Sequence, residues 1–331
     1  MEIPKIYKDS DADITLIKSR KVGIVGFGNQ GRAQALNLRD IGVDVSIGLR
    51  EGSASRKLAE SEGLNCLSIS KTLEDCDIIS LLVPDQIMGN VYQIHIASTI
   101  QEGQTLLFSH GYNIHYKVIQ PPDFINVIMA APSGAGSELR KQYQAGKGIP
   151  GLFAIDQDYT GDSRKVALSY CRAIGLTRVG VFESTFKEET ETDLFGEQII
   201  LTGGIPKLIQ SSYKVLLEEG YSPVSAWFVC YYELKTIVDM FHSKGFEFMN
   251  SSISDTAEYG GITRGKRIID EHVENEMRKA LKEIQSGEFH KEWQKETKSG
   301  FPTLSKLRKE EKHLPIEKIG TKILKDLFGE K

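Results

Sequence analysis

The sequence has 331 residues, of which 40% are hydrophobic and 26% charged, and its formal net charge at pH 7 is −4. This composition suits a globular protein large enough for two domains, and the acidic balance argues against a nucleic-acid partner, which would need a basic surface. The sequence lacks the apolar stretch of a secretion signal or of a membrane helix, so we expect a cytoplasmic protein without a membrane partner.

The first half of the chain alternates short apolar runs with helical stretches. Strands are expected at Lys21–Gly26, Asp44–Leu49, Asp77–Val83, Thr105–Ser109, Asn126–Ala131, Gly151–Asp156 and near Arg178–Phe182. Helices are expected at Gly31–Asp40, Ser53–Glu62, Asp85–Thr99 and Asp162–Ile174. Alternating strands and helices predict βαβ units and a mostly parallel sheet, covered on both faces.

Beyond about Glu183 the pattern becomes that of long amphipathic helices. Helices are expected at Thr190–Thr202, Ile205–Glu219, Val224–Ser243, Asp255–Tyr259 and Arg267–Ser286, with Gly220 and Gly245 as stop signals. The charged segment that follows Glu288 is interrupted by Pro302 and Pro315. The fold class is therefore α/β, with a Rossmann dinucleotide-binding domain over residues 1–183 and an all-helical domain over residues 184–331.

A glycine-rich motif connects the first of these strands to the helix after it. Its residues are Gly26, Phe27, Gly28, Asn29, Gln30 and Gly31, which match the pattern G-x-G-x-x-G. Glycines allow a tight turn and close approach of a pyrophosphate, and the following helix offers free N–H groups and partial positive charge. The motif predicts a dinucleotide site, and the alternative is a glycine-rich turn without a ligand.

The segment after the second strand indicates which dinucleotide is bound. NAD-dependent proteins usually have an acidic residue here, which holds the ribose hydroxyls. In this chain Arg50 can instead pair with a 2′-phosphate, and Ser53 and Ser55 can donate hydrogen bonds to it, with Ser53 as a further candidate cap of the next helix. Glu51 would repel a phosphate if it faced inward. We predict NADPH, and the alternative is a solvated charged loop.

An acidic segment opens the helical half of the chain. Asp193 and Glu197 are four residues apart, so on a helix they share one face and repel each other unless a cation lies between them. Carboxylate oxygens at this spacing suit Mg²⁺. Spacing alone leaves open the alternative of a solvated acidic face.

Three further residues are candidates for the same site. His110 follows a strand, at the sheet edge where ligands bind in open α/β folds, and it can move protons near neutral pH; the alternative is a structural histidine that caps a loop. Glu233 is a carboxylate on a long apolar helix, and it can face a metal or pair with lysine. Ser254 begins a polar segment that also reads as a helix cap, because Asp255 and Glu258 have the spacing of a capping box.

Together these motifs resemble the class I ketol-acid reductoisomerases. The segments that carry the resemblance are Gly26–Gly31, Leu49–Ser55, Ser109–His115, Lys187–Ile199 and Ile253–Gly260. Their order and spacing match from Ile6 to about Ile319, nearly the whole chain. The acidic segment and the segment ISDTAEYG are specific to the family, whereas the glycine motif is not.

The resemblance implies an enzyme of branched-chain amino-acid synthesis. Such enzymes convert 2-acetolactate or 2-aceto-2-hydroxybutyrate to 2,3-dihydroxy acids, through a Mg²⁺-dependent alkyl shift and hydride transfer from NADPH. Asp193 would bridge two Mg²⁺ ions, Glu197 would bind one ion and Glu233 the other. Ser254 would contact the substrate, and His110 would assist proton movement.

The resemblance also implies further cofactor contacts and a partner subunit. Asp85, Gln86 and Gly136 would contact NADPH. The helical domain of the family is knotted and pairs closely with a second copy, so Glu233 and Ser254 would reach the active site from the partner subunit. A homodimer or higher homo-oligomer with a shared active site is therefore expected.

Two positions depart from the family pattern. Ser133 stands where lysine is usual, and Val229 stands one turn before Glu233 where a second glutamate is usual. The first change removes a cation and the second a carboxylate, and losing such a metal partner typically costs about 10–100-fold in affinity or activity. Two alternatives therefore remain: an NADPH-dependent reductase without the isomerase step, and a catalytically impaired NADPH-binding paralogue.

Overall fold

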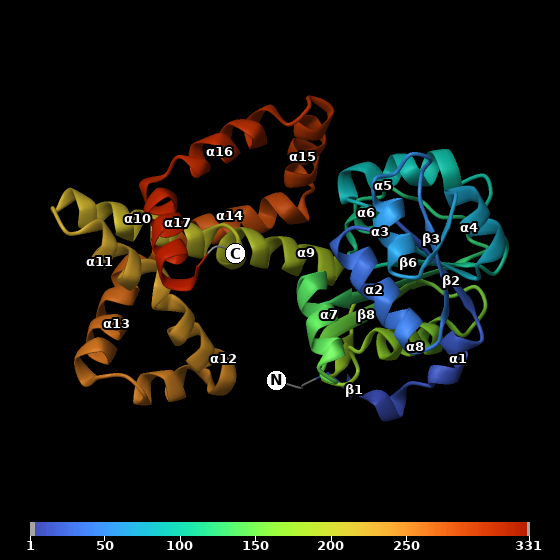
Figure 1. Cartoon of the computed structure of the whole chain (residues 1–331), viewed down its shortest axis with the longest axis horizontal. Helices are drawn as coiled ribbons and strands as arrows, with labels where there is room; N and C mark the ends of the chain where they lie inside the picture. Colours follow the sequence, from blue (N-terminus) through green and yellow to red (C-terminus); the bar gives the residue numbers. More distant parts are fainter. Residues whose placement is uncertain (1–3, 330–331) are drawn as a thin grey trace. The chain divides into compact units, whose positions relative to one another are not determined.

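The computed structural model describes residues 4–329, and the chain divides into two compact units, residues 1–190 and 191–331. The first unit holds every strand that the structure describes, as Figure 1 shows in blue to green. These strands are β1 (Ile6–Tyr7), β2 (Lys21–Val25), β3 (Asp44–Gly48), β4 (Asn65–Leu67), β5 (Ile78–Leu81), β6 (Thr105–Phe108), β7 (Asn126–Pro132), β8 (Gly151–Gln157) and β9 (Val181–Glu183).

The strands form one mixed sheet of nine strands in the order β1-β9-β8-β7-β6-β5-β2-β3-β4. From β4 to β7 all neighbours run parallel, so their carboxyl ends share one edge. β8 pairs antiparallel with β7, and β1 pairs antiparallel with β9. The expectation of a mostly parallel sheet is confirmed, although the short strands β1 and β4 were not predicted.

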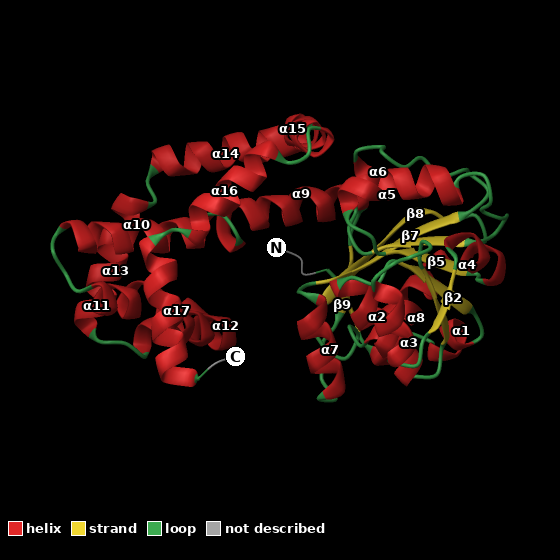
Figure 2. Ribbon diagram, turned by 45° about the horizontal axis from the view of Figure 1, so that its top comes forward, coloured by secondary structure: helices red, strands yellow, loops and turns green. Residues whose placement is uncertain are grey.

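Helices cover both faces of this sheet (Figure 2). They are α1 (Ile14–Lys18), α2 (Asn29–Asp40), α3 (Ser55–Ser61), α4 (Ile69–Asp75), α5 (Asp85–Val91), the π-helical segment η2 (Tyr92–Ile96), α6 (Tyr112–His115), α7 (Gly136–Gln144) and α8 (Ser163–Ile174). Side chains of β7 alternate between two cores: Ile128 and Ala130 pack with α2, α7 and α8, whereas Val127 and Met129 pack with α4, α5 and α6. Burial on both faces explains the continuous apolar runs of these strands.

The second unit is helical throughout its described residues. Its elements are α9 (Phe186–Gly196, which begins in the first unit), η3 (Glu197–Leu201), α10 (Gly204–Glu218), α11 (Pro223–Trp227), η4 (Phe228–Tyr232), α12 (Leu234–Ser251), α13 (Asp255–Ile268), α14 (Glu271–Gln285), α15 (Glu288–Lys298), α16 (Pro302–Lys312) and α17 (Pro315–Phe328). Its small buried core surrounds Trp227, against which Gly320 packs so closely that a Cβ would lie 2.6 Å from the indole nitrogen.

The two glycines predicted to end helices in the second unit do interrupt helical backbone. Gly220 has a positive φ of 81° just after α10, and Gly245, with φ 86°, breaks the helical path inside α12. Pro302 and Pro315 do not leave the tail irregular, because each occupies the first turn of a helix, where a missing N–H costs nothing. Among the described residues, none of the helices combines the length and apolar character needed to cross a membrane.

Candidate functional site

The glycine motif forms a tight turn between β2 and α2. Gly26 has φ 104°, and a Cβ there would lie 2.7 Å from the carbonyl oxygen of Leu82. A Cβ on Gly31 would lie 2.6 Å from the carbonyl oxygen of Gly26, whereas Gly28 faces open space. These are the three demands of a pyrophosphate turn: an unusual backbone angle, close helix–strand packing and room for the ligand.

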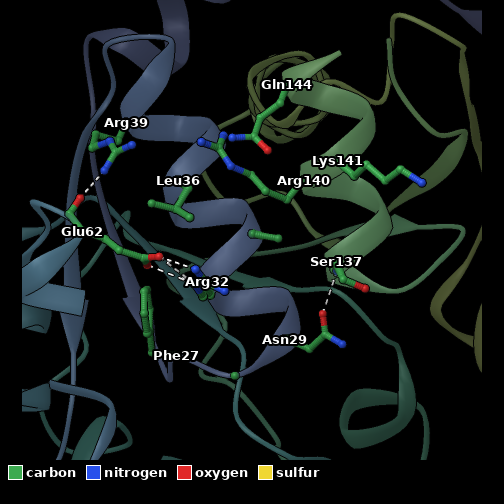
Figure 3. Close-up of a pocket in the computed structure, with 13 residues that line it drawn as sticks. Phe27, Asn29, Arg32, Leu36, Arg39, Glu62, Ser137, Arg140, Lys141 and Gln144 are labelled. Atoms are coloured by element: carbon green, nitrogen blue, oxygen red, sulfur yellow. Dashed lines mark hydrogen bonds and ion pairs between the residues drawn. The ribbon is translucent and has the colours of Figure 1, made fainter. Parts of the chain in front are cut away.

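A groove of about 800 Å³ runs from this turn between α2 and α7 (Figure 3). Gly136 lies at the start of α7, and a Cβ on it would be 2.2 Å from the carbonyl oxygen of Asn29. The next backbone N–H, that of Ser137, donates to the side-chain oxygen of Asn29 at 2.8 Å. The structure therefore brings Gly136 next to Gly28 and Asn29, although more than a hundred residues separate it from them in sequence.

The predicted phosphate-binding residues lie on the loop between β3 and α3. Arg50 is exposed, and the N–H of Ser53 donates to its carbonyl at 3.2 Å, so the loop is folded back on itself. Ser53 and Ser55 are half-buried. The expectation that Ser53 caps the next helix is wrong, because α3 begins at Ser55 with Ala54 in the cap position and no side-chain cap.

The loop after β5, which lies on the other side of β2, carries two further predicted cofactor contacts. Asp85 and Gln86 open α5, directly after β5. The carboxamide of Asn113 on α6 donates to the backbone carbonyl of Asp85 at 3.3 Å, which fixes the start of α5 against the end of β6. Both residues thus lie at the carboxyl edge of the sheet, as the glycine turn does.

His110 follows β6 at the same edge and is held by a buried carboxylate. Its Nδ1 lies 2.9 Å from Oε1 of Glu189, a side chain only 6% exposed. The other oxygen of Glu189 accepts the backbone N–H of Gly111 at 2.6 Å. A carboxylate only accepts, so the neutral imidazole carries its proton on Nδ1, and Nε2 is the nitrogen that lacks one.

Glu189 is the residue of this candidate site that the sequence analysis did not single out. The acidic segment drew attention to Asp193 and Glu197, yet Glu189 precedes Asp193 by one turn of the same helix and has the same four-residue spacing. This four-residue spacing is the sequence feature that could have identified Glu189 as a member of the same acidic helix face. Gly111 confirms how closely α9 packs here, because a Cβ on it would lie 2.5 Å from the carbonyl oxygen of Phe186.

The remaining predicted residues lie on helices of the second unit. Asp193 lies on α9, and Glu197 begins the π-helical segment η3. Glu233 follows the π-helical segment η4, and all three carboxylates are exposed. Wide π turns recur at functional positions of helices. Ser254 is the N-cap of α13, and its hydroxyl accepts the N–H of Ala257 at 3.2 Å. The capping box predicted to begin at Asp255 is therefore wrong, because the N-cap is Ser254, one residue earlier.

The residues present fit the two groups that the sequence implies. The turn from Gly26 to Gly31 leaves room for a pyrophosphate at the amino end of α2. Asp193, Glu197 and Glu233 are hard oxygen donors, the chemistry that Mg²⁺ prefers. With its strand order and its site at the carboxyl edge, the first unit defines a Rossmann-type dinucleotide-binding protein.

Comparison with known proteins gives the family. A model described as the acetohydroxy acid isomeroreductase NADPH-binding domain matches residues 16–180, and one described as the ketol-acid reductoisomerase C-terminal domain matches residues 186–330. Two proteins named ketol-acid reductoisomerase (NADP(+)), from Methanocaldococcus jannaschii and Methanothermobacter thermautotrophicus, are each 47% identical over 97% of this chain and cover 97% and 98% of their own lengths.

A solved structure agrees with this relationship. An NADH-preferring ketol-acid reductoisomerase from an uncultured archean has a TM-score of 0.95 and 39% sequence identity. The match covers 98% of this chain and all of that one. The chain belongs to the ketol-acid reductoisomerase family.

Proposed function

We propose that the chain is an NADPH-dependent ketol-acid reductoisomerase of branched-chain amino-acid synthesis. It converts 2-acetolactate or 2-aceto-2-hydroxybutyrate to the corresponding 2,3-dihydroxy acid. The observation that carries the proposal is the placement of the glycine turn and the His110–Glu189 pair at one edge of the sheet, in a chain that matches both halves of the family.

The cofactor would lie across this edge. Backbone N–H groups at the start of α2 would hold its pyrophosphate, because the turn leaves a helix end open there. Arg50, Ser53 and Ser55 would hold the 2′-phosphate that distinguishes NADPH from NADH. Asp85 and Gln86, on the far side of β2 from that loop, would contact the nicotinamide half.

Proton movement would fall to His110. Glu189 keeps the proton on Nδ1, so Nε2 can accept a proton from a substrate hydroxyl and return it later. The carboxylate also stabilises the imidazolium that forms in between. Because Glu189 is buried and also accepts the Gly111 N–H, the ring cannot swing away from this orientation.

The metal site would use the carboxylates of the helical unit. Asp193 would lie between two Mg²⁺ ions, with Glu197 on one and Glu233 on the other. When bound, the ions would polarise the substrate ketone and stabilise negative charge on its oxygens. Ser254 would contact the substrate through the hydroxyl hydrogen that its capping role leaves available.

A second copy of the chain would complete this site. The helical unit exposes many large apolar side chains, including Val215, Val229, Phe246 and Tyr259, while its core contains few buried ones. An apolar surface of this kind marks an interface. The partner subunit would supply Glu233 and Ser254, in a cytoplasmic dimer whose domains divide near residue 183.

The test is a Mg²⁺ titration of NADPH oxidation with two substrates. 2-Acetolactate requires both the alkyl shift and the reduction, whereas 3-hydroxy-3-methyl-2-oxobutyrate, the rearranged intermediate, requires only the reduction. We expect Mg²⁺-dependent turnover of both. Turnover of the second compound alone would instead assign a reductase without the isomerase step, the alternative that Ser133 and Val229 motivate. Turnover of neither, with normal NADPH binding, would contradict an enzymatic role.

A further inference from the structure

A network of hydrogen-bonded side chains links the glycine turn with Ser109, the residue before His110. Gln34 on α2 lies at its centre, with Nε2 3.1 Å from Oε1 of Gln30 and 2.9 Å from the hydroxyl of Ser109. The phenol of Tyr170 on α8 donates to Oε1 of Gln34 at 2.8 Å and lies 3.4 Å from the hydroxyl of Ser80. Gln34, Tyr170 and Ser80 are fully buried, which excludes water from the centre of this network, whereas Gln30 and Ser109 at its ends are half-buried.

A single backbone carbonyl fixes the direction of the hydrogen bonds that Gln34 makes with Gln30, Ser109 and Tyr170. The carbonyl of Gly134 can only accept, so the carboxamide of Gln30 turns its nitrogen toward it, at 2.9 Å. The oxygen of Gln30 then faces Gln34, which must present its own nitrogen. The oxygen of Gln34 is left for the Tyr170 phenol, whose pKa is raised by burial, so the phenol remains a donor.

The consequence falls on Ser109. Its oxygen accepts an N–H of Gln34, so its own hydroxyl hydrogen has to be donated elsewhere. Among residues 4–329 no side chain or carbonyl accepts that hydrogen, although the side chain is only half-buried. The hydroxyl of Ser109, at the carboxyl end of β6, therefore has its hydrogen available for an acceptor outside the described chain.

The sheet order identifies the part of the ligand that lies there. The pyrophosphate turn follows β2, and the loop after β3 on one side of it is the predicted 2′-phosphate site. The dinucleotide crosses the carboxyl edge, so its other half lies toward β5 and β6. Ser109 is therefore on the nicotinamide side of the turn, next to the residue assigned to proton movement.

We propose that Ser109 donates its hydroxyl hydrogen bond to an oxygen of the nicotinamide-ribose half of NADPH, and that Gln34 is the positioning residue that imposes this direction. The inference rests on the proposed function, because it takes the bound ligand to be NADPH. It adds a cofactor contact and a supporting side chain that neither the glycine motif nor the phosphate loop predicts.

The experiment compares the binding of NADPH with that of 2′,5′-ADP, which has the 2′-phosphate and the adenosine but no nicotinamide. Isothermal titration of the full chain should show Ser109→Ala binding NADPH about three- to tenfold more weakly, the effect of one lost neutral hydrogen bond. The same variant should bind 2′,5′-ADP as the wild type does. Ser109→Thr, which keeps the hydroxyl, should restore NADPH affinity.

A second pair of variants tests the positioning role. Ser109→Ala should weaken NADPH binding much less in a Gln34→Leu background than in the wild type, because an unfixed hydroxyl is no longer aimed at the ligand. Ser80→Ala is the matched control. It removes a buried hydroxyl at the far end of the same hydrogen-bond network, and it should leave NADPH affinity unchanged.

Three results would overturn the proposal. Unchanged NADPH affinity in Ser109→Ala would mean that the hydroxyl makes no hydrogen bond to the cofactor. Equal weakening for NADPH and 2′,5′-ADP would mean a general loss of structure. A wild-type protein that binds neither compound would refute the NADPH site itself, and that result is distinct because it appears before any residue is changed.

Discussion

The two units of the molecule differ in how the polar side chains of the candidate site are held. In the sheet unit the site residues are supported from within: Glu189 holds His110, Asn29 accepts the Ser137 N–H, and Gln34 connects Gln30 with Ser109. In the helical unit Asp193, Glu197 and Glu233 are exposed on their helices, as are many large apolar side chains.

The difference indicates which part of the candidate site, the cofactor part or the metal part, a single chain can form on its own. A folded sheet unit has a buried core on both faces of the sheet and a shaped turn, so we expect it to bind cofactor without help. Exposed carboxylates on a unit whose surface is also apolar are typical of a site completed by other groups, which we propose to be cations and a second copy of the chain. The predictions below test this division, beginning with the largest effect.

The first prediction concerns the metal. Asp193→Asn should lower Mg²⁺-dependent turnover of 2-acetolactate by at least about 100-fold, because a bridging negative charge disappears. Titration should show NADPH affinity unchanged, since Asp193 is not among the predicted cofactor contacts. Asp239→Asn, which removes an exposed carboxylate of α12 that pairs with Lys235, is the control and should keep full turnover. Wild-type turnover in Asp193→Asn would remove this residue from the site.

The second prediction concerns the cofactor. Replacing Ser53 and Ser55 together by aspartate should weaken NADPH binding by about 100-fold, because two hydrogen bonds to a charged phosphate are lost and repulsion is added. NADH affinity should change little. Ser61→Asp adds the same charge at the other end of α3 and should leave both affinities unchanged. An equal loss for both dinucleotides would show that the loop does not read the 2′-phosphate.

The third prediction concerns the partner subunit. Val215 on α10 is 56% exposed, and Val215→Arg should raise the dimer dissociation constant by about 30-fold, since an unpaired charge in an apolar interface costs about 2 kcal/mol. Sedimentation velocity over a concentration series measures this constant. Ile94 is 71% exposed but belongs to the sheet unit, so Ile94→Arg should leave it unchanged. A monomeric wild-type protein with full turnover would contradict the shared site.

The smallest predicted effect is a pH dependence within the sheet unit. The Nε of Arg32 lies 3.0 Å from both oxygens of Glu62, and this hydrogen bond lowers the pKa of that carboxyl from its ordinary 4.5. A lowered pKa means that the stabilisation is present above pH 4.5 and is lost as the pH falls through the lower value. Since Arg32 is half exposed, we expect Glu62→Gln to cost about 0.5–1 kcal/mol at pH 7.

Urea unfolding at pH 7 and at pH 3 checks the sign. The difference between the wild type and Glu62→Gln should be smaller at pH 3, where the wild-type carboxyl is becoming protonated. Glu60→Gln is the matched control, because its carboxylate is half exposed and lies 3.6 Å from Arg56, so a smaller change is expected. A difference that grew in acid would show that the pair does not stabilise the fold.

The sequence predicts those parts of the fold and site that depend on neighbours along the chain. The turn from Gly26 to Gly31 is local, so its pattern was sufficient to find it. The strands of the sheet core have continuous apolar runs and were found, whereas β4 has three residues and β1 two, too few to form a pattern. Helix α7 was missed because its short polar sequence has no clear apolar repeat.

Contacts between distant segments could not be predicted in this way. Glu189 and His110 are 79 residues apart, and Gln34 and Ser109 are 75 apart, so no spacing rule connects them. The antiparallel pairing of β8 with β7 is similarly hidden, because α7 connects them just as a helix would connect parallel strands. The metal ligands came from resemblance and spacing, and their roles stay predictions.

The double acceptance by Glu189 has one more consequence. Glutamine has nearly the same shape as glutamate, but it offers one acceptor and one donor where the carboxylate offers two acceptors. The glutamine oxygen would accept the Gly111 N–H, which can only donate. The glutamine NH₂ group would then face Nδ1 of His110. The neutral imidazole would then carry its hydrogen on Nε2, so the residue that we propose as a proton acceptor would instead present a donor to the substrate.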